Sequence, residues 1–261
     1  MPDPSDPTTN ILRAHQGEFP RSAGYDLDLA MDHAMGPNVL WLAEWLCDPL
    51  GLEPGMRVLD LGCGKALSSI FLAKEYGVRV WATDLWIDPH SNWKRIEAAD
   101  VGHLVCPVHA EAHDLPYAHG FFDVVVSLDS YQYYGTDNLY LPYLVRFLKP
   151  AGILATASVG LTKEFPLEIP PDLGPQWDPE LRCFHDLEWW KRHFDGSGLV
   201  RVEQAENHPH GWALWKEWEE AIARAGKSPY PMDPGFFTEA TREYFTLQKL
   251  VARAHRPPTP A

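Results

Sequence analysis

The chain has 261 residues, 45% of them hydrophobic, which is enough to bury the core of one α/β domain with insertions. Its 36 acidic residues against 22 Lys and Arg give a formal net charge of −14, which disfavours nucleic acids and anionic membranes as partners because both attract cations. No apolar run approaches membrane-spanning length, and the four isolated cysteines match neither a disulfide framework nor a zinc motif.

The two ends of the chain differ from its middle. Residues 1–10 and 256–261 are polar and rich in proline, so we expect disordered tails around a single domain over residues 11–255. The N-terminal tail has no basic region followed by an apolar segment, so no secretion signal is predicted and we expect a cytoplasmic protein. After a mixed lead-in, the dense apolar residues of Val39–Leu46 predict a helix that packs on a sheet.

One β-α-β unit follows and organises the rest of the chain. The apolar run Val58–Leu61 predicts a buried parallel strand, and Gly62 and Gly64 come directly after it. Two close glycines let the backbone turn sharply and approach a ligand. The apolar spacing of Ser68–Tyr76 predicts a helix, and Val78–Thr83 predicts a second strand.

Two acids of this unit indicate which ligand it binds. Asp84 ends the second strand about 20 residues beyond the glycines, the spacing that places a carboxylate on ribose hydroxyls. Asp60 lies two residues before Gly62, where a carboxylate repels a pyrophosphate and attracts an ammonium. The third glycine of a dinucleotide loop is replaced by Leu67. The pattern therefore favours S-adenosylmethionine, which has a ribose and an ammonium but no phosphate, and an NAD-linked oxidoreductase stays a distant alternative.

The remainder of the chain predicts a doubly wound, mostly parallel α/β sheet, because strands alternate with helices. Further strands are expected at His103–Val108, Phe121–Leu128, Ile153–Val159, Leu199–Ala205 and Phe245–Ala254. Helices are expected at Asp137–Phe147, Asp186–Phe194 and Trp212–Ala225. Residues 160–185 are rich in proline and have no period, so we expect an irregular insertion after the fifth strand that caps the substrate side.

The segment Val58–Ala66 resembles the first motif of the class I S-adenosylmethionine-dependent methyltransferases, and Asp84 resembles their ribose-binding acid. The resemblance implies a Rossmann-like, seven-stranded sheet in the order 3-2-1-4-5-7-6, with the seventh strand antiparallel. It also implies that the cofactor contacts Cys63 between the glycines, and Leu85 and Trp86 after the acid.

A second segment, His109–Tyr117, resembles the Asp-Ala-x-x-Leu-Pro-Phe run of the same family, with Glu111 in the acid position and Ala112 after it. The resemblance implies that Glu111 accepts a hydrogen bond from the adenine amine and that the Ala112 amide donates one to the ring. In similar enzymes the lead-in segment closes over the cofactor, which makes Tyr25 a weaker candidate for that role.

Candidates for the acceptor side follow the fourth strand, because open parallel sheets bind ligands at the carboxyl ends of their strands. Asp129 is expected to face either the methionine end of the cofactor or the acceptor. Tyr131, Tyr133 and Tyr134 could line a methyl-transfer pocket, since tyrosine faces attract a sulfonium. His185, between the irregular segment and a helix, is a candidate general base. Our catalytic candidates are therefore His185, Tyr131 and Asp129.

We expect a small-molecule methyltransferase that moves the methyl group in line and releases S-adenosylhomocysteine. Two alternatives stay open: an enzyme that uses the same cofactor for intramolecular alkylation or cyclisation and releases methylthioadenosine, and a non-catalytic cofactor-binding scaffold. The expected partner is a small-molecule acceptor, and a homo-oligomer is left open. No metal site is predicted, and His208 and His210 are expected in a surface loop.

Overall fold

The computed structural model describes residues 10–255, apart from residues 170, 172, 175–176 and 229–233. The predictions of disordered tails at residues 1–10 and 256–261 therefore lie outside the described residues, except for Asn10. The side chain of Asn10 accepts hydrogen bonds from the N–H groups of Leu12 and Arg13 and so caps the first helix, α1 (Ile11–Ala14).

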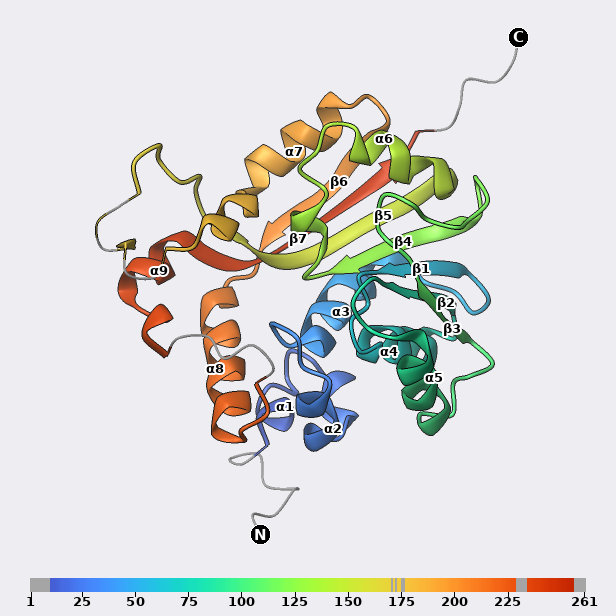
Figure 1. Cartoon of the computed structure of the whole chain (residues 1–261), viewed down its shortest axis with the longest axis horizontal. Coiled ribbons are helices and arrows are strands. Elements are labelled where there is room, and N and C mark those ends of the chain that lie inside the picture. Colours follow the sequence, from blue (N-terminus) through green and yellow to red (C-terminus); the bar gives the residue numbers. More distant parts are fainter. Residues whose placement is uncertain (1–9, 170, 172, 175–176, 229–233, 256–261) are drawn as a thin grey trace.

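The described residues form a seven-stranded sheet in the order β3-β2-β1-β4-β5-β7-β6 (Figure 1). Its strands are β1 (Arg57–Leu61), β2 (Arg79–Asp84), β3 (Val105–His109), β4 (Phe122–Leu128), β5 (Leu148–Leu161), β6 (Val200–Asn207) and β7 (Phe245–Ala254). Neighbouring strands run parallel except at β7, which is antiparallel to both β5 and β6. The expected strand order, the antiparallel seventh strand and the doubly wound α/β class are confirmed.

Helices cover both faces of this sheet, which explains why its central strands are apolar on both sides (Figure 1). One face carries α3 (Val39–Cys47), α4 (Leu67–Tyr76), α5 (Pro89–Ala98) and α8 (Gly211–Arg224). The other carries α6 (Tyr140–Leu144) and α7 (Leu187–Gly196). Each face has its own core: Trp41 and Trp218 are buried in the first, and Phe122, Tyr140 and Phe194 in the second.

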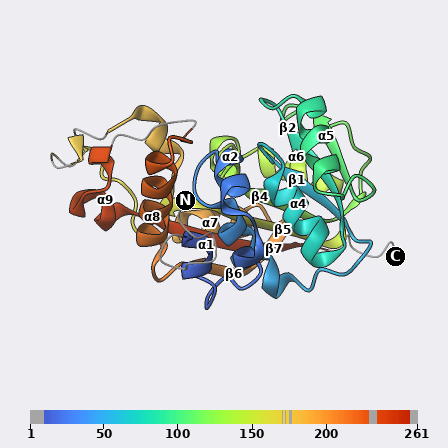
Figure 2. The same ribbon diagram turned by 90° about the horizontal axis from the view of Figure 1, so that it is seen from below.

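The lead-in segment is built into the first face. Its helices α1 and α2 (Leu27–Asp32) lie between α8 and α4 (Figure 2). Phe19 stacks on Trp41 of α3 at 5.5 Å, and Trp218 of α8 donates a hydrogen bond to the carbonyl oxygen of Gly36 at 3.1 Å. The lead-in thus joins α8 to the helices beside β1, although the two parts are far apart in sequence.

Several elements differ from the sequence prediction. The expected helix over 137–147 is shortened to α6 and a 3-10 turn, because Asp137 accepts from the Leu139 N–H and forms a turn first. Helix α5 was not predicted, although Asp88 caps it and Pro89 opens it. His208 is 4% exposed rather than in a surface loop, because its imidazole packs edge-on against Trp45 at 4.9 Å.

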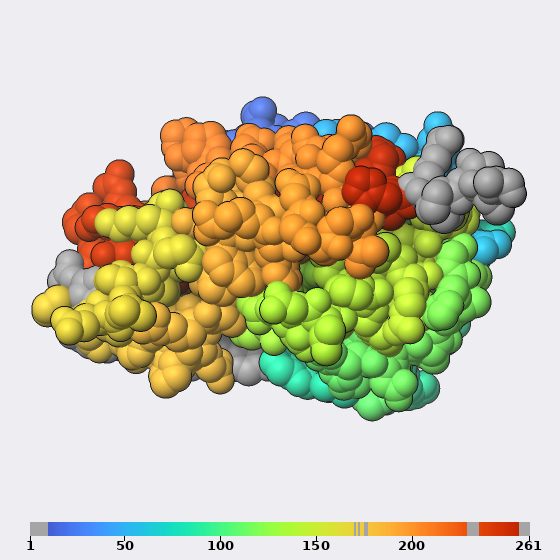
Figure 3. All heavy atoms as spheres, turned by 90° about the horizontal axis from the view of Figure 1, so that it is seen from above, coloured from blue at the N-terminus to red at the C-terminus, as the bar shows by residue number. Residues whose placement is uncertain are grey.

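The segment after β5 packs at one end of the molecule beside α9 (Glu239–Tyr244) (Figure 3). In this segment the ring of Phe165 stacks on the ring of Tyr244, with the centroids 5.4 Å apart, and contacts the ring of Phe245 at a centroid distance of 5.7 Å. Between β5 and the 3-10 turn at Pro179–Cys183, the described residues of the segment form no strand or α-helix, in agreement with the predicted irregular insertion. Within the described residues, no helix has both the length and the apolar character needed to cross a membrane.

Candidate active site

The glycine turn after β1 is covered closely by two other segments. Gly62 and Gly64 have positive φ angles of 74° and 52°, which strain any residue with a side chain. A Cβ on Gly62 would collide with Ser130 Oγ, and one on Gly64 would lie 2.7 Å from Met35 Sδ. The loop after β4 and the end of the lead-in therefore reach this turn only because both positions are glycine.

Asp84, at the carboxyl end of β2, is aimed at the same turn. Its Oδ2 accepts from the Gly64 N–H at 2.8 Å, and its Oδ1 accepts from the N–H groups of Trp86 and Ile87 at 2.8 and 2.9 Å. Each carboxylate oxygen has two acceptor positions, so these hydrogen bonds fill both positions on Oδ1 and one on Oδ2, and Oδ2 can still accept from a ribose hydroxyl. Leu85 and Trp86 beside it are exposed, Trp86 by 72%, and provide apolar surface next to the carboxylate.

Asp60 is fully buried beneath the turn. Its Oδ2 accepts from the hydroxyls of Ser68 and Ser69 at 2.6 Å each, whereas its Oδ1 has no hydrogen-bond partner among the described residues. Burial raises the pKa of the Asp60 carboxyl to about 6, against the hydrogen bonds of the two serines, which lower it. A buried carboxylate oxygen without a partner is costly unless a donor or a cation completes it.

These groups fit the polar parts of S-adenosylmethionine. Asp84 offers a free acceptor position on Oδ2 for a ribose hydroxyl, and the unpartnered Oδ1 of Asp60 offers an acceptor for an ammonium. No basic side chain is needed, because this cofactor has no phosphate.

The adenine candidates lie beside the end of β2. The Ala110 N–H donates to the Asp84 carbonyl oxygen at 3.2 Å, so this loop starts next to the acid. Glu111 is half-exposed, and it accepts from the N–H of His113 at 2.7 Å and contacts His113 Nδ1 at 2.9 Å. The carbonyl oxygen of Ala112 accepts from a tyrosine hydroxyl of α6 at 3.3 Å. The structure therefore brings Asp84, Glu111 and Ala112 to one edge of the sheet.

Asp129, directly after β4, is held in a fixed orientation. It has a positive φ of 51°, and its N–H extends the strand pairing by donating to Ala157 O at 2.8 Å. Its Oδ1 accepts hydrogen bonds from Gln132 Nε2 at 3.3 Å and from the Val159 N–H at 3.4 Å. Its Oδ2 packs so closely against Gly36 that a Cβ at position 36 would collide with it. Burial raises the pKa of the Asp129 carboxyl to about 7.

The three tyrosines after Asp129 point in different directions. The Tyr134 hydroxyl lies 2.8 Å from Ser130 Oγ, beside the glycine turn. Tyr131 is buried in the core under α7, 5.7 Å from the Trp190 ring, and its hydroxyl lacks a partner in the part of the chain that the structure describes. Tyr133 is 54% exposed and faces the segment after β5. Of the three, Tyr134 is the one that the structure places at the turn.

Two predicted site residues lie away from the turn. The His185 imidazole stacks on Trp189 at 3.7 Å, and its Nδ1 lies 3.0 Å from Glu164 Oε2. The Tyr25 hydroxyl donates to Glu75 Oε1 at 3.0 Å, on the second half of α4. Within the described residues, neither side chain has a hydrogen bond or ring contact to the glycine turn. The described part of the chain also contains no group of three or more side chains that could bind a metal ion.

Sequence reasoning missed Gly36, which packs against the Asp129 carboxylate, and Glu219, a buried acid of α8. Glu219 is in the middle of α8 and is 7% exposed. Burial, with a smaller contribution from the charge of Asp129, raises the pKa of the Glu219 carboxyl to about 7. The signal in the sequence was an acid on the apolar stripe of a helix that also carries Trp215 and Trp218.

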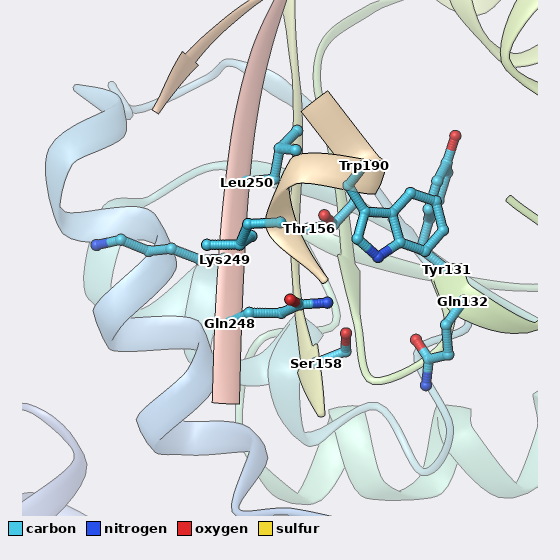
Figure 4. A pocket seen from close by; sticks show the side chains of 9 residues that line it. Tyr131, Gln132, Thr156, Ser158, Trp190, Gln248, Lys249 and Leu250 are labelled. Carbon is cyan, nitrogen blue, oxygen red and sulfur yellow. The ribbon is translucent and has the colours of Figure 1, made fainter. Parts of the chain in front are cut away.

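A cavity of about 10 Å³ lies behind Asp129, between β5, β7 and α7 (Figure 4). Gln132 and Gln248 line it, and the Oε1 atom of each is buried without a partner in the described structure. Gln248 points into the cavity, whereas Lys249, the next residue of β7, points away from it (Figure 4). The volume suits one water molecule, which would satisfy these amides and support the Gln132 contact to Asp129.

The chain resembles known methyltransferases in sequence. Residues 59–156 match the model of the methyltransferase domain family. Over 156 residues the chain is 30% identical to 2-methyl-6-phytyl-1,4-hydroquinone methyltransferase of Synechocystis sp., an alignment that covers 57% of this chain and 48% of that protein. The chain spans less than half the length of the first curated relatives that it matches.

Solved structures share the fold over almost the whole chain. A geranyl diphosphate methyltransferase in complex with S-adenosylmethionine has a TM-score of 0.66 and 20% identity, and the match covers 98% of this chain and 93% of that one. The 4+2 cyclase SpnF has a TM-score of 0.71 and 15% identity, with 95% and 96% covered. Residues 59–156 thus resemble the methyltransferase domain family, and the strand order is the one that the resemblance to the class I S-adenosylmethionine-dependent methyltransferases implied.

Proposed function

We propose that this protein transfers the methyl group of S-adenosylmethionine to a small-molecule acceptor and releases S-adenosylhomocysteine. The observation that carries the proposal is the pair of acids around the glycine turn: Asp84 with a free acceptor position on Oδ2, and the buried Asp60 with an unpartnered oxygen. The bound cofactor supplies an electrophilic methyl group on a sulfonium.

In this proposal each group of the turn has one task. Asp84 accepts from a ribose hydroxyl through Oδ2, and Asp60 accepts from the ammonium of the methionine end. Glu111 and the Ala112 amide bind the adenine edge. Cys63 and the adjoining glycine backbone line the cradle, and the exposed Leu85 and Trp86 offer an apolar shelf for the adenine ring.

The protein itself contributes mainly alignment and the exclusion of water. Methyl transfer from a cation to a neutral nucleophile disperses charge, so little additional stabilisation of charge is required. Asp129 is our catalytic candidate on the acceptor side because it precedes Ser130, which touches the glycine turn, and its carboxylate packs against Gly36 of the lead-in. We propose supporting roles for Tyr131, beneath that loop, and for His185, in the wall formed by residues 160–185. Tyr25 is proposed to hold the lead-in against α4 as it covers the cofactor.

The names of the relatives support a small acceptor, since they refer to a methylphytylhydroquinone and to geranyl diphosphate. The net charge of −14 also argues against nucleic acids and anionic membranes as partners. A cytoplasmic location is part of the proposal and is supported by the four cysteines, which are free thiols. A homo-oligomer is compatible with it.

A second candidate function uses the same cofactor for chemistry other than methyl transfer. The likeness to the 4+2 cyclase SpnF, which extends over nearly the whole of both chains, favours keeping it. Product analysis separates the two: S-adenosylhomocysteine is expected from methyl transfer, and methylthioadenosine would instead indicate alkylation by the aminobutyrate chain.

The proposal is tested by calorimetric titration of the protein with S-adenosylhomocysteine. We expect saturable binding, and we expect Asp84→Ala to weaken it by about 1–3 kcal/mol because a ribose hydroxyl loses its acceptor. Glu97→Gln, an exposed acid on α5, is the matched control and should bind like the native protein. Native affinity in Asp84→Ala, with the fold verified by circular dichroism, would contradict the assignment.

A further inference from the structure

The last part of the lead-in, residues 32–36, lies against the glycine turn, and we refer to it as the strap. Met35 is the strap residue that touches the turn, because its Sδ would lie 2.7 Å from a Cβ on Gly64. Lys65, which follows Gly64, donates a hydrogen bond from its Nζ to the carbonyl oxygen of Asp32 at 2.7 Å. Both ends of this contact show that the strap covers the turn at Gly64.

The backbone of the strap does little to hold it in this position. The Ala34 N–H donates to the Met31 carbonyl oxygen at 3.1 Å. Beyond it, Met35, Gly36 and Pro37 take part in none of the backbone-to-backbone hydrogen bonds of the described residues. A segment without such hydrogen bonds opens at a low cost in free energy. Side chains from other elements must therefore hold the strap on the turn.

Two of these side chains come from α8 and the residues after it. Trp218 of α8 donates from its indole N–H to the Gly36 carbonyl oxygen at 3.1 Å. Lys227, three residues beyond the end of α8, has its Nζ 3.0 Å from Asp28 Oδ1 and 3.1 Å from Asp32 Oδ1. The same Nζ donates to the carbonyl oxygen of Asp28 at 3.2 Å. An ammonium has three N–H donors, so Lys227 uses all of them to hold the start of the strap.

The contacts of Lys227 can open without disturbing the fold. Its side chain is 25% exposed, and those of Asp28 and Asp32 are 84% and 62% exposed. Ion pairs as exposed as these contribute little free energy and are screened by salt. Within the described residues, the Lys227 ammonium makes no hydrogen bond or ion pair with the glycine turn itself. It therefore acts on the turn only through the strap.

We propose that Lys227 is a positioning residue that holds the strap closed over the glycine turn and so controls how fast S-adenosylmethionine and S-adenosylhomocysteine enter and leave. This inference rests on the proposed function and adds the control of access to it. The Met35 side chain lies on Gly64, so the strap has to move before a ligand reaches that glycine. This movement separates Lys227 from Asp32, and the ion pair therefore opposes both entry and exit.

The test measures the association and dissociation rate constants of S-adenosylhomocysteine by stopped-flow tryptophan fluorescence. Lys227→Met keeps an apolar side chain of similar length and removes the ammonium. We expect both rate constants to rise about two- to fivefold, because opening the strap no longer breaks the ion pairs. The dissociation constant should change less than either rate constant. Added potassium chloride should speed the exchange in the native protein and have little effect on Lys227→Met.

Lys216→Met is the matched control, because Lys216 lies on α8 and its Nζ is 3.8 Å from Glu220 Oε1 of the same helix. It should exchange the ligand at the native rates. Asp32→Asn removes one of the two carboxylates that Lys227 contacts, and both rate constants should again rise, by a smaller factor.

The inference is overturned if Lys227→Met, with its fold verified by circular dichroism, keeps both native rate constants. It is also overturned if dissociation alone becomes faster, because Lys227 would then stabilise only the bound form and would not control entry. Failure of the native protein to bind S-adenosylhomocysteine would instead count against the proposed function, so the two failures are distinguishable.

Discussion

Replacing Glu219 by glutamine should stabilise the protein at alkaline pH. The native carboxyl is 7% exposed on α8, and burial raises its pKa from an ordinary value of 4.5 to about 7. The folded state therefore holds the proton more tightly than the unfolded state does, and ionising the group costs the folded state free energy. Glutamine has the same shape, keeps an oxygen that can accept from Trp215, and carries no charge.

The magnitude follows from the pKa difference. One pKa unit corresponds to about 1.36 kcal/mol, so the ionised carboxylate costs the folded state roughly 3 kcal/mol above pH 7. The cost is absent below pH 4.5, where the group is protonated in both states, and grows as the pH rises to 7. The free energy of unfolding of the variant should therefore equal that of the native protein near pH 4.5 and exceed it by roughly 3 kcal/mol at pH 8.5.

The assay is equilibrium unfolding in urea at pH 4.5, 6 and 8.5, with Glu220→Gln as the control on the exposed side of the same helix. Thermal melting provides a second reading, in which each kcal/mol should correspond to about 2–4 °C for a chain of this size. The control should show no pH-dependent gain. Equal stability of Glu219→Gln and the native protein at pH 8.5, or a less stable variant, would refute the reasoning about the buried charge.

Two further substitutions separate the glycine turn from the rest of the fold. Gly62→Ala forces a positive φ of 74° on alanine and places its Cβ against Ser130. We therefore expect the free energy of unfolding in urea to fall by about 1–3 kcal/mol and S-adenosylhomocysteine to bind more weakly. Native stability together with native affinity would contradict this. Asp186→Ala removes the N-cap side chain of α7, which accepts a hydrogen bond from the Trp189 N–H. The protein should lose about 1 kcal/mol of stability, and its affinity for the cofactor should not change. An altered affinity would show that the start of α7 belongs to the site.

Local patterns in the sequence were sufficient to predict most of the sheet. The strand before Gly62 and the strand that ends at Asp84 are buried on both faces, so their composition identifies them without knowledge of their neighbours. The spacing between Asp60, Gly62 and Asp84 likewise follows from one β-α-β unit, which keeps the cofactor residues within about 25 positions of each other.

Residues that depend on distant contacts could not be predicted. Gly36 and Trp218 are 182 positions apart, and only the tertiary structure shows the hydrogen bond between them that joins the lead-in to α8. The orientation of Tyr25 depends in the same way on Glu75, 50 positions later. Sequence spacing identifies an acid within an apolar stripe, but it does not say which element will cover that stripe.

The position of β7 affects how the chain can fold during synthesis. β5 and β6 each pair with β7 and not with each other, so the sheet stays divided until residues 245–254 have left the ribosome. Until then the outer edge of β5 has unpaired backbone groups over the nine residues that later pair with β7, Ile153 to Leu161, and such edges promote aggregation. At about 5–20 residues per second, translation from β5 to β7 takes at least several seconds, during which the nascent chain would benefit from a chaperone.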